Sequence, residues 1–153
     1  MVSTVGNKFV ENLLKRYSTD SIITVERSSD VYFSILEKRF PLYGSKIDWD
    51  SVPGALQKES NVQDSDNFFK DAFSFLNELE SHGKMSDSDE VIIVSDSAIE
   101  EAIRMPLKIL KEILRDLLEL PHHLYILQEN GDWCLAITME GSLCFAHSSV
   151  AGR

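Results

Sequence analysis

The sequence predicts an α+β fold in a single globular domain, 1–153, with a mixed or antiparallel sheet that ends in a C-terminal β-meander and is packed by helices. The chain has the length of one domain, and its 43% hydrophobic and 26% charged residues are typical of a globular protein. Residues 64–82 and 107–120 repeat apolar side chains at helical spacing. Asn130-Gly131 separates two apolar runs, which is a strong signal for a β-hairpin.

The first part of the chain predicts two helices, one strand and one long loop. Residues 8–17 and 30–40 have helical patterning, and Asp30 is suited to cap the second helix. The β-branched run within 21–27 favours a strand. Residues 42–63 are irregular in pattern and long enough to form a functional loop.

The middle of the chain predicts a long helix followed by a buried strand. The helix begins at Asp64 or Ser65 and runs to about His82, where Gly83 ends it. A polar, acidic loop follows at 84–89. The uniformly apolar run 91–94 is typical of a strand that is buried on both faces.

A second helical stretch is predicted after that strand. Ser97 and Glu100 have the spacing of a capping box, which predicts that a helix begins there. Pro106 breaks or kinks this helix, which continues over 107–120 until Pro121 ends it.

The C-terminal meander consists of runs at 124–128, 133–139 and 143–147. With Asn130-Gly131 as a two-residue turn, Ile126 faces Leu135, and alternation divides the side chains between two faces. One face holds Leu124, Ile126, Trp133, Leu135 and Ile137, and the other holds Tyr125, Leu127, Cys134 and Ala136. Both faces are apolar, so we expect helices on both sides of the sheet.

The two cysteines, Cys134 and Cys144, are expected to be buried free thiols. A two-residue turn at Glu140-Gly141 would place Cys144 opposite Ile137 and Cys134 opposite His147, with the two thiols on opposite faces. A three-residue turn would place both thiols on one face but not directly opposed. Neither register allows a disulfide.

No metal site, cofactor or catalytic residue is predicted. Cys134 and His147 would be paired in the first register, but no third zinc ligand is placed by spacing. His122-His123 is expected to form a junction between elements. Asp96 follows the predicted strand as in some nucleotide and metal enzymes, and is the residue on which an enzymatic alternative would rest. The favoured interpretation is that Asp96 stabilises a helix N-terminus.

The charge of the chain is concentrated in one region. Residues 44–101 hold 14 Asp and Glu, 4 Lys and no Arg, a balance of −10 that equals the net charge of the whole protein. Such a field repels nucleic acid and anionic membrane and attracts a basic protein partner. No apolar run approaches the roughly 20 residues of a membrane span, and 1–7 lack the pattern of a signal peptide, so a cytoplasmic location is expected.

The same region supplies the predicted partner-binding residues. An aromatic side chain among carboxylates is typical of a hot spot for a basic surface, although Trp49 is equally suited to pack beneath its loop. The predicted contacts are Asp48, Trp49, Asp50, Asp64, Asp66, Asp71, Glu78, Asp87, Asp89 and Glu90. The alternatives are an ordinary solvated surface, an acidic DNA mimic, or an adaptor protein of a cytosolic complex.

The segments Tyr125-Ile126-Leu127, Gly131-Asp132-Trp133-Cys134-Leu135 and Glu140-Gly141-Ser142-Leu143-Cys144-Phe145 resemble the closing hairpin of bacterial toxin-immunity proteins, including those of contact-dependent growth inhibition systems. The resemblance implies a non-enzymatic protein that binds the toxic C-terminal domain of an effector, often a basic nuclease, and occludes its active site. That family has no shared set of functional residues, so the resemblance assigns no roles by position.

Overall fold

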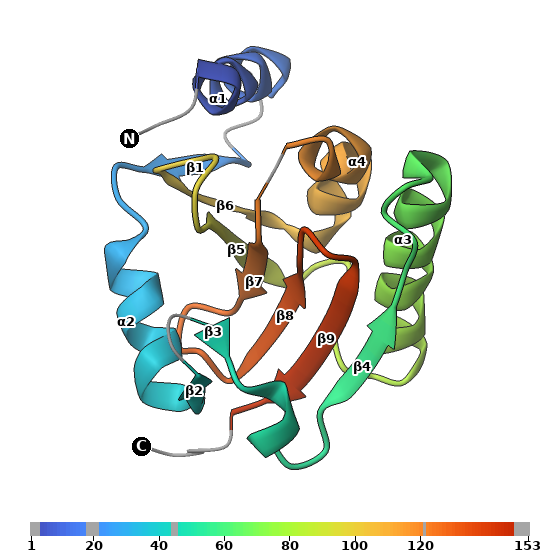
Figure 1. Cartoon of the computed structure of the whole chain (residues 1–153). Coiled ribbons are helices and arrows are strands. Elements are labelled where there is room, and N and C mark those ends of the chain that lie inside the picture. Colours follow the sequence, from blue (N-terminus) through green and yellow to red (C-terminus); the bar gives the residue numbers. More distant parts are fainter. Residues whose placement is uncertain (1–3, 18–21, 44–45, 121, 149–153) are drawn as a thin grey trace.

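A seven-stranded antiparallel sheet forms the centre of the protein and confirms the predicted α+β fold (Figure 1). The computed structural model describes residues 4–17, 22–43, 46–120 and 122–148. The strand order is β1-β6-β5-β7-β8-β9-β4, so β1 and β4 are the two edge strands. Beside the large sheet, β2 and β3 form a separate two-stranded hairpin. Within the described parts of the chain, none of the helices has the length and apolar content needed to cross a membrane.

The helices are α1 Thr4–Arg16, α2 Asp30–Arg39, α3 Ser65–Ser81 and α4 Leu107–Leu118, with a 3-10 turn, η1, at Trp49–Ser51. The strands of the first half are β1 Thr24–Glu26, β2 Leu42–Tyr43, β3 Lys46–Ile47 and β4 Leu56–Glu59. Those of the second half are β5 Glu90–Ser95, β6 Ala102–Pro106, β7 Leu124–Leu127, β8 Trp133–Ile137 and β9 Ser142–His147.

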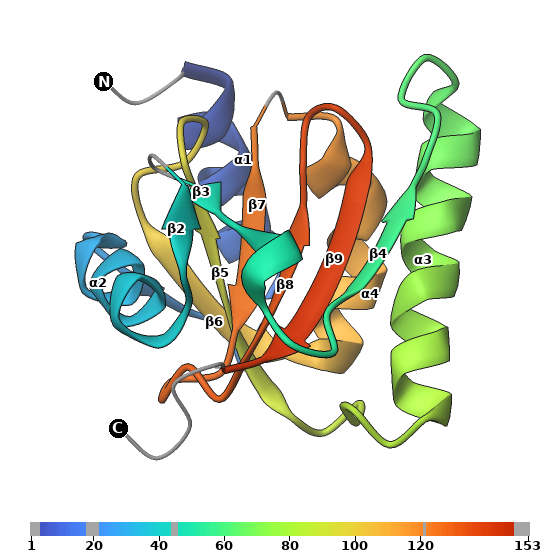
Figure 2. The same cartoon turned by 60° about the horizontal axis from the view of Figure 1, so that its bottom comes forward.

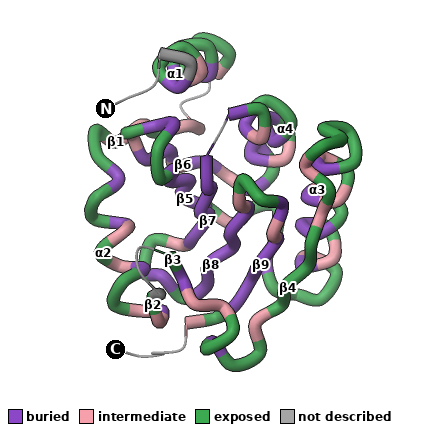
Figure 3. Tube along the Cα trace, viewed as in Figure 1, coloured by how far each residue is buried: buried purple, intermediate pink, exposed green. Residues whose placement is uncertain are grey.

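The sheet separates two hydrophobic cores, as its two apolar faces predict. The larger core packs α1, α3 and α4 against one face (Figure 2). The smaller core packs α2, Ile47 and Val52 against the other face. Burial is therefore concentrated in the central strands, while β4 is exposed at every position (Figure 3).

The predicted division of the first hairpin is confirmed. Ile126 pairs with Leu135, and Gly131 has a φ of 76°, the left-handed conformation that a tight turn requires. The five side chains predicted for one face belong to the larger core, and the four predicted for the other face belong to the smaller core. Alternation along the strands was therefore sufficient to assign both faces.

The second hairpin selects one of the two registers that the sequence left open. Ala136 pairs with Cys144, and Cys134 pairs with Ala146. This corresponds to the three-residue turn, so both thiols face the smaller core. His147 pairs with Trp133 rather than with Cys134, which removes the basis of the Cys134–His147 zinc alternative.

The predicted helix beginning at Ser97 is wrong. Ala102–Pro106 is instead strand β6, which pairs with both β1 and β5. Ile103 and Met105 are completely buried, and their two-residue spacing places both in the larger core. The hydroxyl of Ser95, rather than a capping box, accepts a hydrogen bond from the Ala98 amide at 3.0 Å. Sheet pairing on both sides of β6 thus outweighs the local helical signal.

Residues 42–63 are more ordered than predicted. They form the β2–β3 hairpin, η1 and strand β4, which pairs with β9 along Leu56–Glu59. All four residues of β4 are exposed, so the sequence shows no apolar alternation there.

The start of α2 also differs from the prediction. Ser29 occupies the N-cap position expected for Asp30, and the Ser28 hydroxyl accepts a hydrogen bond from the Asp30 amide.

The other predicted helices are confirmed within a few residues of their ends. The Asp64 side chain accepts a hydrogen bond from the Asn67 amide at the start of α3, and Gly83 has a φ of 72° just beyond its end. Helix α1 begins earlier than predicted, at Thr4. Pro121, predicted to end α4, and Ser21, predicted to open the first strand, lie outside the described residues.

Candidate partner-binding surface

Four of the predicted contact acids form ion pairs within the protein. Asp66 pairs with Arg115 at 2.8 Å, Asp87 with Lys111 at 2.9 Å, and Glu90 with Arg104 at 2.9 Å. Glu78 pairs with Lys58. Three of these four bases lie in β6 and α4, outside the acidic stretch 44–101. Tertiary packing therefore brings bases from later in the chain to α3 and its following loop, and these bases compensate part of the negative charge of residues 44–101.

Three acids in or beside strand β4 have only neutral partners among the described residues. Asp48 accepts from the Ser51 hydroxyl at 2.7 Å, and Asp50 accepts from Gln57 Nε2 at 3.1 Å. Glu59 accepts from the Ser142 hydroxyl at 2.9 Å. Within the described residues, no basic side chain lies within ion-pair distance of these three carboxylates, which we call the β4-edge acids.

Two of the β4-edge acids, Asp50 and Glu59, lie on one side of the sheet. Gln57 pairs with Cys144 across β4 and β9, and alternation places Glu59 on the same face as Gln57. Burial raises the pKa of Cys144, and with the added effect of the nearby charges of Glu59 and Asp50 the pKa reaches about 12. Both carboxylates are therefore close enough to this thiol to act on it, although they come from different elements.

The remaining predicted contact acids have structural roles. Asp64 caps α3, and Asp89 accepts a hydrogen bond from the Ser86 amide at 2.9 Å. Asp71 accepts from the Ser60 hydroxyl at 2.7 Å and so joins α3 to the end of β4. These hydrogen bonds set the position of each carboxylate.

The predicted contacts do not form one patch. Asp48, Trp49 and Asp50 lie in and beside η1, four acids lie at or along α3, and the other three precede or begin β5 (Figure 1). The Trp49 ring is only partly exposed and packs against Phe40 at the end of α2, with ring centroids 6.3 Å apart. This placement favours the interpretation in which Trp49 packs beneath its loop.

A buried serine–histidine pair lies at the end of β5, and no sequence signal indicated it. His122 Nδ1 is 2.7 Å from Ser95 Oγ, and its Nε2 is 3.0 Å from the Leu117 carbonyl. The carbonyl can only accept, so Nε2 carries the proton and Nδ1 accepts from the Ser95 hydroxyl. Ser95 Oγ also accepts a hydrogen bond from the Ala98 amide, in the segment that follows β5. The hydrogen bonds of Ser95 and His122 therefore connect the end of β5 both to this segment and to the end of α4.

Asp96 differs from its predicted role because no helix begins after it. Its Oδ1 accepts hydrogen bonds from the His123 amide at 2.9 Å and the Ser97 hydroxyl at 3.0 Å. Asp96 thus holds the start of β7 beside the end of β5. Among the described residues, no group of three or more His, Cys, Asp or Glu side chains is arranged to hold a metal ion.

We expect the stability of the protein to fall as the pH decreases below about 6.5. Burial lowers the pKa of His122 from its ordinary value of 6.5, so the unfolded chain binds the proton more readily than the folded one. The stabilisation is therefore complete above pH 6.5 and is lost as the pH falls toward the folded pKa. Urea unfolding between pH 7 and 5 measures this.

Two variants distinguish the effect of His122 on the pH dependence of stability from the effects of other titrating groups. His122→Gln should flatten the pH dependence, whereas the exposed His147→Gln should retain it. An unchanged slope in His122→Gln would contradict the assignment.

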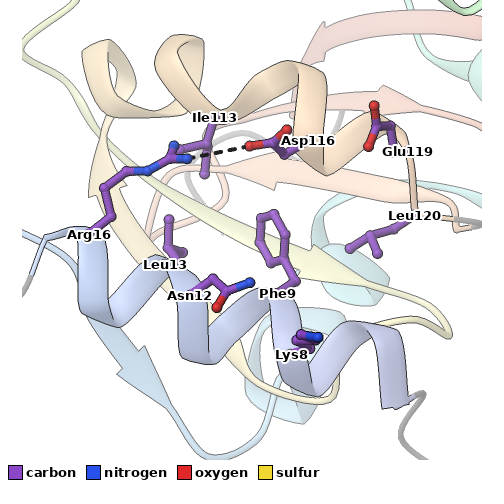
Figure 4. Close-up of a pocket in the computed structure, with 9 residues that line it drawn as sticks. All are labelled: Lys8, Phe9, Asn12, Leu13, Arg16, Ile113, Asp116, Glu119 and Leu120. Carbon is purple, nitrogen blue, oxygen red and sulfur yellow. Dashed lines mark ion pairs between the residues drawn. The ribbon is translucent and has the colours of Figure 1, made fainter.

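A groove between α1 and α4 has a volume of about 550 Å³ (Figure 4). Its apolar wall includes Phe9 and Leu120, and an ion pair between Arg16 and Asp116 at 3.7 Å crosses one end. Two bases and two acids line it: Lys8, Arg16, Asp116 and Glu119. This balance of charge gives the groove no electrostatic preference for a basic partner.

No protein family model matches the chain, and no significant match was found among curated proteins. The functional argument therefore rests on the arrangement of the residues.

Proposed function

We propose that this protein is a non-enzymatic inhibitor that binds a basic protein partner. The observation that carries the proposal is the set of β4-edge acids, which, within the described part of the chain, accept hydrogen bonds only from the side chains of Ser51, Gln57 and Ser142. Because neutral donors position a carboxylate without cancelling its charge, these side chains leave a negative potential at one edge of the sheet. A basic surface would gain both association rate and electrostatic complementarity there.

We further propose that the partner is the toxic C-terminal domain of a bacterial effector, as the resemblance over residues 125–145 implies. A nuclease toxin needs a basic surface to hold its polyanionic substrate. An acidic inhibitor with a net charge of −10 would compete for that surface and occlude the active site. The proposed location is the cytoplasm, where an immunity protein would meet such a toxin.

Affinity capture tests the proposal. The protein is immobilised and exposed to nuclease-treated lysate of the source organism, and retained proteins are identified after washes at low and high salt. One basic partner that survives high salt and loses toxic activity in the complex would support an immunity function. Release of many basic proteins together at moderate salt would contradict it and favour the DNA-mimic alternative.

With that partner in hand, the triple variant Asp48→Asn, Asp50→Asn, Glu59→Gln is expected to bind more slowly. The association rate at low ionic strength should fall about tenfold, with a smaller loss at high salt because screening already weakens steering. Asn and Gln retain a carbonyl oxygen as the hydrogen-bond acceptor, so local structure should persist. Stopped-flow or surface-binding kinetics across a salt series measures the effect.

The matched control is the triple variant Asp66→Asn, Glu78→Gln, Glu90→Gln, which changes the net charge equally. These acids are already paired with Arg115, Lys58 and Arg104. We expect the smaller loss of rate in this control. Equal losses in the two triple variants would show that only total charge matters and would exclude the β4 edge as the contact surface.

A further inference from the structure

Two adjoining cavities lie on the α2 side of the sheet, at the end of strand β5. The larger, of about 630 Å³, is bounded by α2, the β2–β3 hairpin and β7. The smaller, of about 480 Å³, lies between the start of α2 and the segment that follows β5. Phe33 and Asp96 line both cavities and so mark the place where they meet.

A tyrosine in the lining of the larger cavity has a hydroxyl with hydrogen-bonding capacity to spare. Tyr125 lines this cavity and is only 5% exposed, and among the described residues its hydroxyl has no hydrogen-bond partner. Burial raises the pKa of Tyr125, as do the nearby Cys134 and Asp96, so the phenol stays neutral. The hydroxyl is therefore free to accept a hydrogen bond from a ligand in the cavity.

The charges around the cavities favour a positively charged ligand. Four acids line them: Asp30, Glu37, Asp96 and Glu100. The basic residue among the lining side chains is Lys46, which is 3.5 Å from Glu140 and is thereby offset. The lining is therefore strongly acidic, in contrast to the balanced groove between α1 and α4.

One oxygen of Asp96 is available for a ligand. Its Oδ1 already accepts from the His123 amide and the Ser97 hydroxyl, whereas Oδ2 is 4.0 Å from the ring Nε2 of His123. The Phe33 ring meets Tyr125 edge-on, with centroids 6.0 Å apart, and also borders the cavity. A carboxylate, a phenol oxygen and an aromatic ring together suit a planar cation.

Building on the proposed function, we propose that this double cavity receives an arginine side chain of the basic partner. The guanidinium donates to Asp96 Oδ2 and to the Tyr125 oxygen, and lies beside the Phe33 ring. Arginine is favoured over lysine because its planar group of five donors can reach two acceptors and contact an aromatic ring at once. The two cavities, of about 630 and 480 Å³, are large enough for an arginine side chain.

The probe for this site is N-acetyl-arginine amide, with N-acetyl-citrulline amide as an uncharged control of similar shape. Titration of isotope-labelled protein should give saturable NMR shifts centred on Phe33, Asp96 and Tyr125. The citrulline probe should bind at least about tenfold more weakly, since it lacks the charge-assisted hydrogen bonds. Equal binding of the two probes, or shifts centred elsewhere, would overturn the assignment.

Two variants define the contacts. Asp96→Asn should weaken arginine binding about tenfold while keeping the Oδ1 acceptor, and Tyr125→Phe should weaken it about threefold. The Tyr125 hydroxyl has no internal partner among the described residues, so Tyr125→Phe should unfold at the same urea concentration as the parent. Asp66→Asn, remote from the cavities, is the control and should bind like the parent.

The same variants distinguish this site from the proposed function. If the arginine probe binds here but no basic partner exists, the double cavity stands as an arginine-binding site, and the inhibitor proposal fails together with the partner as the source of that arginine. If a basic partner binds and its affinity is unchanged by Asp96→Asn and Tyr125→Phe, the cavity assignment is wrong and the inhibitor proposal stands.

Discussion

Replacing Gly141 by alanine is expected to lower the free energy of unfolding by about 3–4 kcal/mol. Gly141 has a φ of 99°, and an added Cβ would lie 2.2 Å from the Ser60 carbonyl oxygen and 3.0 Å from Val62. The obstructing atom is backbone and cannot move aside as a side chain can. The Ser60 amide also donates to the Gly141 carbonyl at 2.8 Å, so the clash would separate the end of β4 from the β8–β9 turn.

Gly54→Ala is the matched control for this substitution. Its φ of 74° is also in the left-handed region, but nothing lies within 4 Å of the added Cβ. This variant should lose only the conformational cost, about 1 kcal/mol. Urea unfolding of both variants measures the difference, and similar losses would show that Gly141 is needed for its backbone angle alone. Because β4 carries Glu59, we also expect Gly141→Ala to weaken partner binding.

Arg104→Met is expected to cost about 2–3 kcal/mol of unfolding free energy. The Arg104 side chain is 17% exposed and donates to Glu90 at 2.9 Å, Glu26 at 3.2 Å, Glu129 at 3.3 Å and the Tyr32 hydroxyl at 2.8 Å. Methionine retains an apolar stem but leaves three carboxylates close together without a cation. The loss should be smaller at high salt, where their mutual repulsion is screened.

Arg115→Met provides the comparison for this prediction. Arg115 is 49% exposed, pairs with Asp66 and stacks on Phe69 at 4.2 Å, so its loss should cost no more than about 1 kcal/mol. Thermal or urea unfolding of Arg104→Met and Arg115→Met at two salt concentrations compares their losses of unfolding free energy. If Arg104→Met were as mild as Arg115→Met, the cluster around Arg104 would have no stabilising role.

The elements that the sequence predicted correctly are those in which local pattern and burial agree. Alternation along β7 and β8 assigned each side chain to the right core, and the apolar run in β5 is buried on both faces. The caps Asp64 and Gly83 marked α3 because their effects depend only on the adjacent chain. These signals need no knowledge of distant contacts.

The elements that it missed depend on partners far away in the chain. Strand β4 has no apolar alternation, and its place is set by pairing with β9, more than 80 residues later. Ser97 and Glu100 have the spacing of a capping box, but no helix begins there. The residues that follow form β6 instead, which pairs with β1 on one side and β5 on the other. The Ser95–His122 pair joins two residues that no spacing rule relates.

By itself, the sequence determined the fold class, the two-sided core of the sheet, and a net charge of −10 concentrated in residues 44–101. These properties follow from composition and short-range periodicity. Only the tertiary structure decided which of those charges remain without a basic partner, because Arg104, Lys111 and Arg115 approach the acidic region from β6 and α4. Charge is a property of each residue, but its compensation is a property of the distances between residues, and folding sets those distances.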